Sequence, residues 1–337
     1  MKMDEIAKIA GVSKTTVSRV MNKRPDVNPE TRDKILKVIE EYNFKPNAMA
    51  KAISLRRSHT IGMIIPYDAE YIFSNPYYVE VMRGVYTEAD KRGYALLICY
   101  PHNHNYEDMF NQKQVEGYIV ISPGNDHKYM LQSLIDVKAP FVSTANIIEG
   151  DTKINVVDVD NYSGGRQMTE YLYKLGHQDI AYIGKSSITS SMDRFHGYRD
   201  VLDEKGIPYR ETMVKIIDKG SIVNAEEATK ELLEKNDNIT AIFAASDMLA
   251  IGAIKAIKAL GKKVPKDISI VGFDDIPFAE HYDPPLTTMR QPTYDKGVEA
   301  VNMLINMLEN DDDTVNEVKL LDLKLIERKS AAKLRRP

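Results

Sequence analysis

The sequence lacks several features that would define large classes of protein. Its single cysteine, Cys99, cannot form an internal disulfide, and the apolar run around it favours a buried core position in a reducing compartment. No run approaches the roughly 18 apolar residues of a membrane helix, and the charged start Met1-Lys2-Met3-Asp4-Glu5 is unlike a signal peptide. We therefore expect a cytoplasmic protein without membrane contact.

Motifs for catalysis and for cofactors are also missing. The sequence has no phosphate-binding Walker loop, no dinucleotide fingerprint and no nucleophile elbow. His102 and His104 have no third ligand at metal-binding spacing, which favours a surface loop. The sequence predicts no enzyme activity, no catalytic residue, no cofactor and no metal.

Charge is divided unevenly along the 337 residues. Residues 1–60 contain 13 Lys or Arg and 7 Asp or Glu, a net charge of +6, whereas the remaining residues carry 32 against 42, a net charge of −10. With 43% hydrophobic residues, the chain can bury a sizeable core in about two domains of roughly 150 residues. The composition indicates a basic head on an acidic body.

Residues 1–46 predict three short helices. Gly11 ends the first helix, and the Ser13 hydroxyl can cap the second by accepting a hydrogen bond from the N–H near Thr16. Asn28 followed by Pro29 is typical of the start of a third helix. Apolar residues at helical spacing are Ile6, Ile9 and Ala10 in the first helix and Val17, Val20 and Met21 in the second. The third helix is expected to bury Ile35, Val38, Ile39 and Tyr42.

The second predicted helix has a polar face that suits a DNA major groove. This face carries Lys14, Thr15, Ser18, Arg19 and Asn22. Arg can donate two hydrogen bonds to guanine, and the other side chains can reach base edges or phosphates. Helix periodicity alone leaves a second interpretation open, a solvated helical cap whose charges only keep it soluble.

The literal sequence distinguishes these interpretations. The run Ile6-Ala7-Lys8-Ile9-Ala10-Gly11-Val12-Ser13-Lys14-Thr15-Thr16-Val17-Ser18-Arg19-Val20-Met21-Asn22, followed by Val27, Thr31-Arg32, Tyr42 and Pro46-Asn47, resembles the headpiece of the lac repressor (LacI/GalR) family of transcription regulators. The resemblance implies a helix-turn-helix unit in which Lys14, Thr15 and Arg19 contact bases. It also implies phosphate contacts from Ser13, Thr16, Ser18 and Asn22, and from Lys2, which replaces the family's usual Thr.

Residues 47–60 follow as a short segment with strong helix formers behind Asn47. Such a segment is shorter than the roughly 12 to 15 residues that an isolated helix needs, so a plain linker is one interpretation. The resemblance instead implies a hinge helix that folds on DNA and inserts an apolar wedge into the minor groove. Its contacts would be Asn47, Ala50, Lys51 and Ile53, with Ile53 in place of the family's usual Leu and Lys51 in place of Arg.

Residues 61–330 alternate between apolar strand-like runs and amphipathic helices, which indicates parallel α/β sheets. Strand-like runs lie at 61–66, 94–99, 117–121, 140–143, 179–184, 213–217, 240–244, 269–273 and 323–327. About ten strands exceed one comfortable sheet, so we expect two doubly wound lobes with a cleft between them and a crossover at residues 158–161. The predicted N-terminal lobe spans about 61–159 and 292–320, and the C-terminal lobe about 160–291 and 321–330.

This body resembles the sugar-binding core of the same family, which is similar to periplasmic sugar-binding proteins. The resemblance rests on Gly176-His177, Val264-Pro265, Val271-Gly272-Phe273-Asp274-Asp275 and Pro285-Leu286-Thr287-Thr288. It implies effector contacts from Tyr77, Tyr78, Asp160, Arg194, Ser246, Phe273, Asp274 and Gln291. Aromatic faces suit a sugar ring and charged groups suit its hydroxyls, although each aromatic alone could equally be lobe packing.

Together these features predict a homodimeric repressor of carbohydrate-utilisation genes. It would bind a pseudo-palindromic double-stranded DNA operator and be released by a small sugar or sugar derivative in the cleft. The segment around residues 73–84 looks most like the maltose-regulon branch of the family. Two alternatives stay open: a regulator of the same fold that needs a purine-like or phosphocarrier corepressor, and a stand-alone sugar-binding protein.

Overall fold

The computed structural model describes residues 3–21, 24–44, 57–99, 105–145, 154–218, 220–310 and 316–334. The chain divides into two compact units, Met1–Ser58 and His59–Pro337. None of the helices in the described ranges is long and apolar enough to cross a membrane. Six of the predicted DNA contacts lie outside these ranges: Lys2, Asn22, Asn47, Ala50, Lys51 and Ile53.

The N-terminal unit consists of three helices around one small core. They are α1 (Met3–Ala10), α2 (Lys14–Met21) and α3 (Pro29–Glu41). Gly11 ends α1 with a φ of 65°, and Asn28 caps α3 by accepting a hydrogen bond from the Glu30 N–H at 2.8 Å. The predicted burial of Tyr42 is wrong, because this residue is 46% exposed, and Ile9 is also 46% exposed although it keeps the helical spacing of the apolar residues. The buried stripe of α1 is Ile6, Ala7 and Ala10, which turns Ile9 outward, and Tyr42 lies beyond the last turn of α3.

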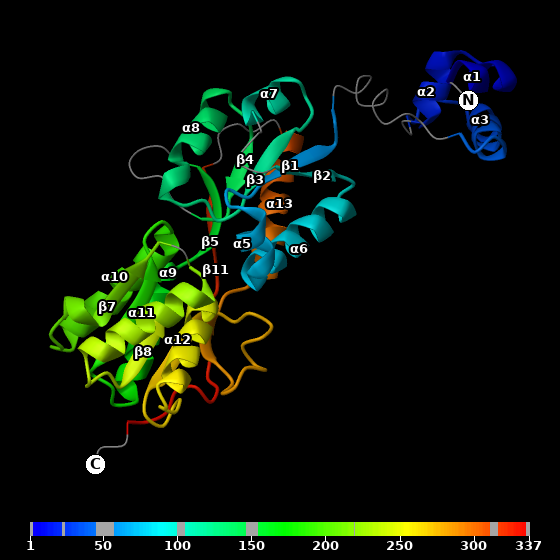
Figure 1. Cartoon of the computed structure of the whole chain (residues 1–337). Helices are drawn as coiled ribbons and strands as arrows, with labels where there is room; N and C mark the ends of the chain where they lie inside the picture. The colour runs from blue at the N-terminus through cyan, green and yellow to red at the C-terminus, as the bar shows by residue number, and fades with distance from the viewer. Residues whose placement is uncertain are drawn as a thin grey trace. The chain divides into compact units, whose positions relative to one another are not determined.

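The second unit has two lobes, each built on a six-stranded sheet (Figure 1). The first sheet has the strand order β11-β5-β4-β3-β1-β2, and all its pairs are parallel. Its strands are β1 (Thr60–Ile64), β2 (Ala95–Cys99), β3 (Gly117–Val120), β4 (Phe141–Ser143), β5 (Asn155–Val159) and β11 (Val318–Leu321). Its helices are α5 (Ala69–Ser74), α6 (Pro76–Lys91), α7 (Tyr106–Asn111), η1 (Asn125–His127), α8 (Lys128–Asp136) and α13 (Thr293–Asn310).

The second sheet has the order β12-β10-β9-β8-β6-β7 and is parallel except for its edge pair, β10 with β12. Its strands are β6 (Ile180–Lys185), β7 (Val214–Ile217), β8 (Ala241–Ala244), β9 (Ser269–Asp274), β10 (Thr287–Arg290) and β12 (Lys324–Ile326). Its helices are α9 (Asn161–Lys174), α10 (Thr189–Glu204), η2 (Glu211–Met213), α11 (Ile222–Lys235) and α12 (Asp247–Ala259). The β12 edge breaks the purely parallel expectation.

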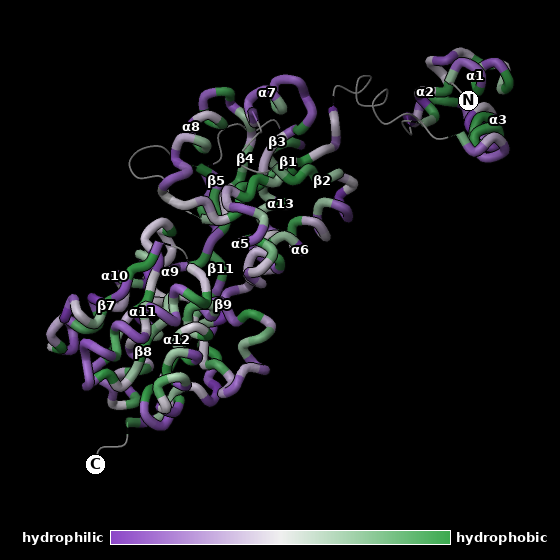
Figure 2. The backbone as a smooth tube through the Cα atoms, in the orientation of Figure 1, coloured by the Kyte–Doolittle hydropathy of each residue, from purple (hydrophilic) through white to green (hydrophobic). Residues whose placement is uncertain are grey.

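Both faces of the first sheet are covered, as a doubly wound fold requires. Along β1, Ile61 and Met63 join one hydrophobic cluster and Ile64 joins the cluster on the other side. Strands buried on both faces read as continuous apolar runs, and the tube of Figure 2 is green along these inner strands. This is why hydrophobic runs in the sequence predicted most of the strands but missed the short or more polar β5, β10 and β11.

The chain passes between the lobes at points next to the cleft. The strand β5 ends at Val159 in the first sheet, and α9, which packs on α10, begins at Asn161. In the described residues the chain also changes lobe after β10 and again after β11, where only two residues separate β11 from β12. The predicted crossover at residues 158–161 therefore lies where the chain changes lobe, and it brings the carboxyl ends of parallel strands to the boundary.

Candidate functional site

The helix α2 presents an exposed polar face in the N-terminal unit. Lys14, Thr15 and Arg19 are exposed, and their neighbour Ser18 is partly buried. The underside of the same helix packs into the core through Val17. A helix that is fixed by one apolar face and carries donors on the other has the form needed to lie in a major groove.

The start of α2 is held by the predicted cap. The Ser13 hydroxyl accepts a hydrogen bond from the Thr16 N–H at 3.1 Å, and the two side-chain hydroxyls lie 2.8 Å apart. This pairing fixes the first turn of α2 and therefore the direction of Lys14 and Thr15. Phosphate contacts by Ser13 and Thr16 remain predictions.

Both long basic side chains of α2 have a carboxylate neighbour. The Lys14 Nζ lies 3.1 Å from Asp4 Oδ2, and the Arg19 Nη1 lies 3.5 Å from Asp26 Oδ2. All four side chains are more than half exposed, so these ion pairs are screened and weak. They orient the two cations and can be exchanged for DNA phosphates at little cost.

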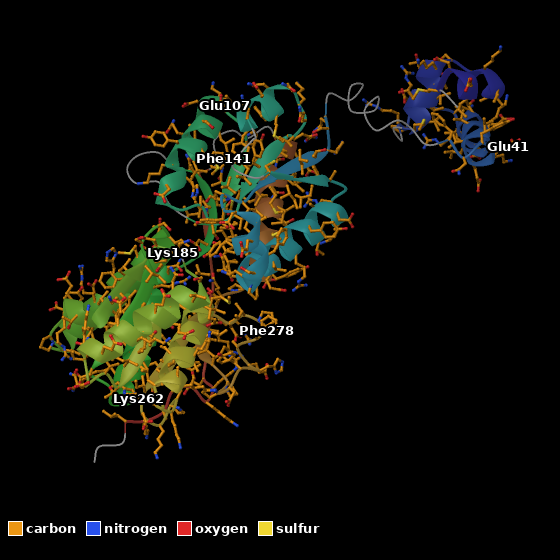
Figure 3. All side chains as sticks on the ribbon, viewed as in Figure 1. Glu41, Glu107, Phe141, Lys185, Lys262 and Phe278 are labelled. Atoms are coloured by element: carbon orange, nitrogen blue, oxygen red, sulfur yellow. The ribbon has the colours of Figure 1, made fainter. Side chains whose placement is uncertain are left out.

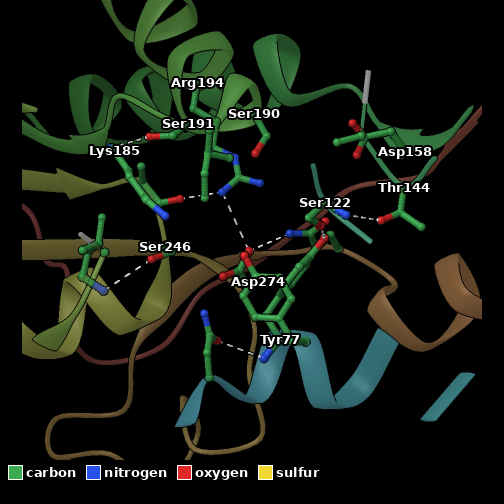
Figure 4. Close-up of a pocket in the computed structure, with 18 of the residues that line it drawn as sticks. Tyr77, Ser122, Thr144, Asp158, Lys185, Ser190, Ser191, Arg194, Ser246 and Asp274 are labelled. Carbon is green, nitrogen blue, oxygen red and sulfur yellow. Dashed lines mark hydrogen bonds and ion pairs between the residues drawn. The ribbon is translucent and has the colours of Figure 1, made fainter. Parts of the chain in front are cut away.

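A second candidate site is a cavity between the two lobes of the core (Figure 4). The space between its lining atoms, together with the opening to solvent, is about 620 Å³. Six predicted effector residues line it: Tyr77, Tyr78, Arg194, Ser246, Asp274 and Gln291. Both lobes contribute to the lining, so a bound molecule would contact the two lobes at once.

Arg194, on α10, is held rigidly on the cavity wall. Its Nε and Nη2 donate to Asn161 Oδ1 at 3.0 and 2.7 Å, and its Nη1 donates to the Ala245 carbonyl at 2.5 Å. The guanidinium carbon lies 3.5 Å from the centre of the Phe273 ring. Phe273 is fully buried and does not line the cavity, so its place in the site is to support Arg194 from below.

Asp274 lies at the end of β9, and its side chain is next to that of Arg194. Its Oδ1 lies 3.8 Å from Arg194 Nη1 and accepts a hydrogen bond from Gln291 Nε2 at 2.6 Å. Burial raises the pKa of Asp274 to about 6, although Arg194, Gln291 and Lys296 oppose this shift. Its φ of 118° is in a region that L-residues rarely adopt, a kind of strain that gathers at binding sites. The carboxylate is therefore a fixed acceptor for hydroxyl groups.

The floor of the cavity contains a buried ion pair that the sequence did not predict. The Lys296 Nζ donates to Asp158 Oδ1 at 2.8 Å and to Gln291 Oε1 at 3.0 Å. Burial opposes the charge of Lys296, but Asp158 and Tyr77 together outweigh it and the pKa is raised. Since Gln291 also donates to Asp274, a continuous hydrogen-bonded chain joins Asp158 to Asp274. One signal was available: Lys296 falls on the apolar face of α13, beside Gly297 and Ala300.

Three predicted effector residues have separate structural tasks. Tyr78 is 2% exposed and packs edge-on against Tyr71 and Tyr77 and at a tilt against Tyr67, so it belongs mainly to the lobe core. Ser246 caps α12 while it lines the cavity. Asp160 is exposed, caps α9 by accepting from the Ser163 N–H at 2.8 Å, and does not line the cavity. Its neighbour Asp158 has the position at the cavity instead.

The aromatic wall of the cavity comes from Tyr77 at the start of α6. Its hydroxyl lies 2.9 Å from the Ser122 Oγ and 3.5 Å from the Lys296 Nζ. The residue is partly buried and lines the cavity, so part of its side chain is accessible to a ligand. Among the described residues, no group of three or more His, Cys, Asp or Glu side chains could hold a metal ion.

Comparison with known proteins gives consistent matches over both units. Residues 2–47 match the family of bacterial regulatory proteins designated lacI, and residues 169–331 match the periplasmic binding protein-like domain. The chain is 31% identical over 335 residues to the HTH-type transcriptional regulator CelR of Thermobifida fusca, covering 97% of each protein.

Two solved structures are similar over nearly the whole chain. A complex of the transcriptional regulator CelR with cellobiose superposes with a TM-score of 0.75 at 29% identity, covering 98% of this chain and all of that one. The lac repressor dimer bound to operator and the anti-inducer ONPF superposes with a TM-score of 0.84 at 27% identity, covering 98% and 99%.

Proposed function

The chain belongs to the lacI family of bacterial regulatory proteins, and we propose on this basis that it is a repressor of carbohydrate-utilisation genes that a small saccharide releases from operator DNA. One observation carries the proposal: a helix-turn-helix unit with an exposed polar recognition face and a polar cavity between two lobes occur in the same chain. The first provides sequence-specific binding, and the second provides a place for a signal.

The chemistry of the cavity supports a saccharide. A sugar ring needs a flat apolar surface for its C–H groups, and Tyr77 provides one. Sugar hydroxyls need fixed charged partners, and Arg194 and Asp274 lie on the same cavity wall, already oriented by buried neighbours. The similarity to a regulator solved with cellobiose is consistent with this ligand class.

Binding in the cavity can reach the DNA-binding unit through the arrangement of the lobes. A ligand that contacts both lobes binds more tightly to one relative position of the lobes than to another. It therefore shifts the equilibrium between these positions by the difference in its binding free energy. The predicted hinge at residues 47–60 would convert that difference into a change in DNA affinity. We further propose that the repressor is a homodimer, because two headpieces on a two-fold axis match a pseudo-palindromic operator and a similar regulator was solved as a dimer on its operator.

The test is fluorescence anisotropy of a labelled duplex from the upstream region of the gene, at one stated salt concentration. The full-length chain is titrated with and without a panel of neutral mono- and disaccharides, malto-oligosaccharides included. Specific binding that one saccharide releases establishes the proposal. Binding that appears only with a purine or a phosphocarrier protein favours the corepressor alternative. Absence of specific binding to any upstream duplex contradicts the proposed function.

A further inference from the structure

The cavity contains one cationic side chain more than its carboxylates balance. Lys296 is paired with Asp158, and Arg194 faces Asp274. The third cation is Lys185, at the end of β6, which lines the same cavity. Among the described residues, no carboxylate lies within 4.0 Å of its ammonium group. A neutral saccharide would leave this charge without a counter-ion.

Lys185 is buried although it is charged. The residue is 7% exposed, and Figure 3 places it at the end of the C-terminal lobe that faces the other lobe. Its Nζ lies 5.0 and 4.8 Å from the ring centres of Tyr67 and Tyr71, which belong to that other lobe. Burial lowers the pKa of Lys185 to about 8, and Asp126 and Asp68 offset only part of the shift. Burial of an ammonium group without an ion pair costs free energy, because the group loses its contacts with water. An anionic ligand would offset this cost.

The first turn of α10 adjoins Lys185 in the cavity wall, as Figure 4 shows for Ser190 and Ser191. This helix has 16 residues, and its N-cap, Ile188, provides no side-chain hydrogen bond. The Ser191 hydroxyl accepts a hydrogen bond from the backbone N–H of Lys185 at 2.7 Å, which joins the helix start to the end of β6. The N–H groups and the dipole of a helix start favour an anion, and a buried cation beside them adds to this preference.

We propose that the saccharide carries an oxyanion, either a phosphate ester or a carboxylate, which binds between the Lys185 ammonium group and the first turn of α10. The inference rests on the proposed function, since it specifies the chemistry of the ligand that this function assigns to the cavity. The neutral part of the ligand would lie against Tyr77, Arg194 and Asp274. The oxyanion would then draw Lys185 toward the ligand and change its contact with Tyr67 and Tyr71, so that charge recognition is coupled to the lobe boundary.

The first experiment uses inorganic phosphate as the probe and isothermal titration calorimetry of the full chain as the readout. We expect Lys185→Met to weaken phosphate binding by about ten-fold or more, the effect of losing a hydrogen bond to a charged group. Met keeps the length of the side chain and can pack beside the two tyrosine rings. Lys185→Arg should retain binding, and Lys174→Met, which removes an exposed lysine from α9, is the matched control. Circular dichroism melting curves establish that each variant is folded.

The second arm compares neutral hexoses with their 6-phosphates and uronic acids. Anionic members should bind at least about ten-fold more tightly than the neutral parent in the wild type, and Lys185→Met should remove this preference. Phosphate-ester affinity should fall as pH rises above about 8, because Lys185 loses its proton, and Lys185→Arg should abolish that fall. The other titratable groups near Lys185, namely Asp68, Asp126, His127, Tyr67 and Tyr71, are unchanged in both proteins.

The two proposals fail in different ways. If neutral saccharides release DNA and neither phosphate nor an anionic sugar binds more tightly than they do, the oxyanion inference is wrong and the proposed function stands. An anion preference that survives in Lys185→Met also overturns the inference. If phosphate binds through Lys185 but no saccharide of either class changes DNA binding, the anion site is supported and the saccharide-responsive function is contradicted.

Discussion

The Nζ atom of Lys296 lies 2.8 Å from Oδ1 of Asp158, in an ion pair whose side chains are 2% and 10% exposed. The two residues are 138 positions apart in the chain. Lys296 belongs to α13, and Asp158 is in β5, shortly before the chain crosses to the other lobe. The pair therefore ties the floor of the cavity to a point where the lobes join.

Removing one partner of the Lys296–Asp158 ion pair should lower the free energy of unfolding far more than removing both partners. Lys296→Met leaves a buried carboxylate without its cation, and we expect a loss of about 3 to 5 kcal/mol in the free energy of unfolding. The double variant Lys296→Met with Asp158→Asn should recover much of this loss. Lys319→Met, which breaks the partly exposed pair with Glu299, is the control and should cost less than about 1 kcal/mol. Urea unfolding followed by circular dichroism measures each value, and equal losses for the two single lysine variants would contradict the assignment.

The affinity for a saccharide should depend on pH through Asp274. Burial raises the pKa of this carboxyl to about 6, so its acceptor oxygens are lost as pH falls below that value. We expect affinity to fall by up to about ten-fold per pH unit below 6 and Asp274→Asn to bind weakly without this dependence. Calorimetry between pH 5 and 8 gives the comparison. The facing groups Arg194, Gln291, Lys296 and Asp247 are common to both proteins, so an unchanged profile in the variant would assign the titration elsewhere.

The raised pKa of Asp274 also makes the free energy of unfolding depend on pH. Its folded value of about 6 exceeds the unfolded value, so the folded state binds the proton more tightly. This residue therefore makes the unliganded protein less stable as pH rises through 6, with little further change above about pH 7. Asp274→Asn should lack that contribution, which differential scanning calorimetry at pH 5 and pH 7 can compare with the wild type.

Arg19 should contribute to sequence discrimination. An arginine that donates two hydrogen bonds to one base contributes about 1 to 3 kcal/mol at that base pair. Arg19→Ala should therefore lose affinity for the operator and become tolerant of base changes at one position in each half-site. Anisotropy titrations on a set of singly substituted duplexes measure this. A loss of the same size on every duplex would instead assign Arg19 to a phosphate.

Asp26 should restrain Arg19 in the free protein. Its Oδ2 lies 3.5 Å from the Arg19 Nη1, and DNA must displace it. Asp26→Asn should tighten operator binding by about two- to five-fold, as expected for an exposed ion pair, and the gain should shrink at higher salt. Asp33→Asn removes the same charge from the exposed surface of α3 and is the matched control. An equal gain in the control would show only a general charge effect.

Gly124 should determine how closely the lobes approach. A Cβ atom added there would collide with the Ser187 carbonyl of the opposite lobe. Gly124→Val should force the lobes apart and lower saccharide affinity by about ten-fold, because the closed arrangement becomes a minor population. Headpiece binding to non-specific DNA should be unaffected. Calorimetry with the releasing saccharide checks the first expectation, and wild-type affinity in the variant would show that closure does not require this contact.

Local features of the fold were predictable from the sequence because they depend on neighbours within one or two turns. The Ser13 cap, the Asn28-Pro29 helix start and the stop at Gly11 were predicted by residue type and spacing. Tyr42 was assigned to the core wrongly, because an apolar residue at helical spacing does not show which neighbour covers it.

The cavity was predictable only in part. The family motifs pointed to Arg194, Asp274 and Gln291, and the structure brings these three together. Lys185 and Asp158 were not among the expected site residues, since in the sequence each is only a charged residue at or near the end of a strand. Whether these two residues reach the cavity depends on which strands are adjacent. Adjacent strands of a parallel sheet are joined by crossover connections of many residues, so adjacency cannot be read from neighbouring positions in the sequence.

The sequence by itself determined the three N-terminal helices, most of the strands, the basic head and the family. It could do so because periodicity, capping and motif spacing are properties of short segments. The tertiary structure alone decided which charges face one another across the cavity: it joined Lys296 to Asp158 and left Lys185 buried beside two tyrosines without a carboxylate at ion-pair distance in the described residues. The physical reason is that burial and Coulomb interactions depend on distances in space between residues that are far apart in the chain.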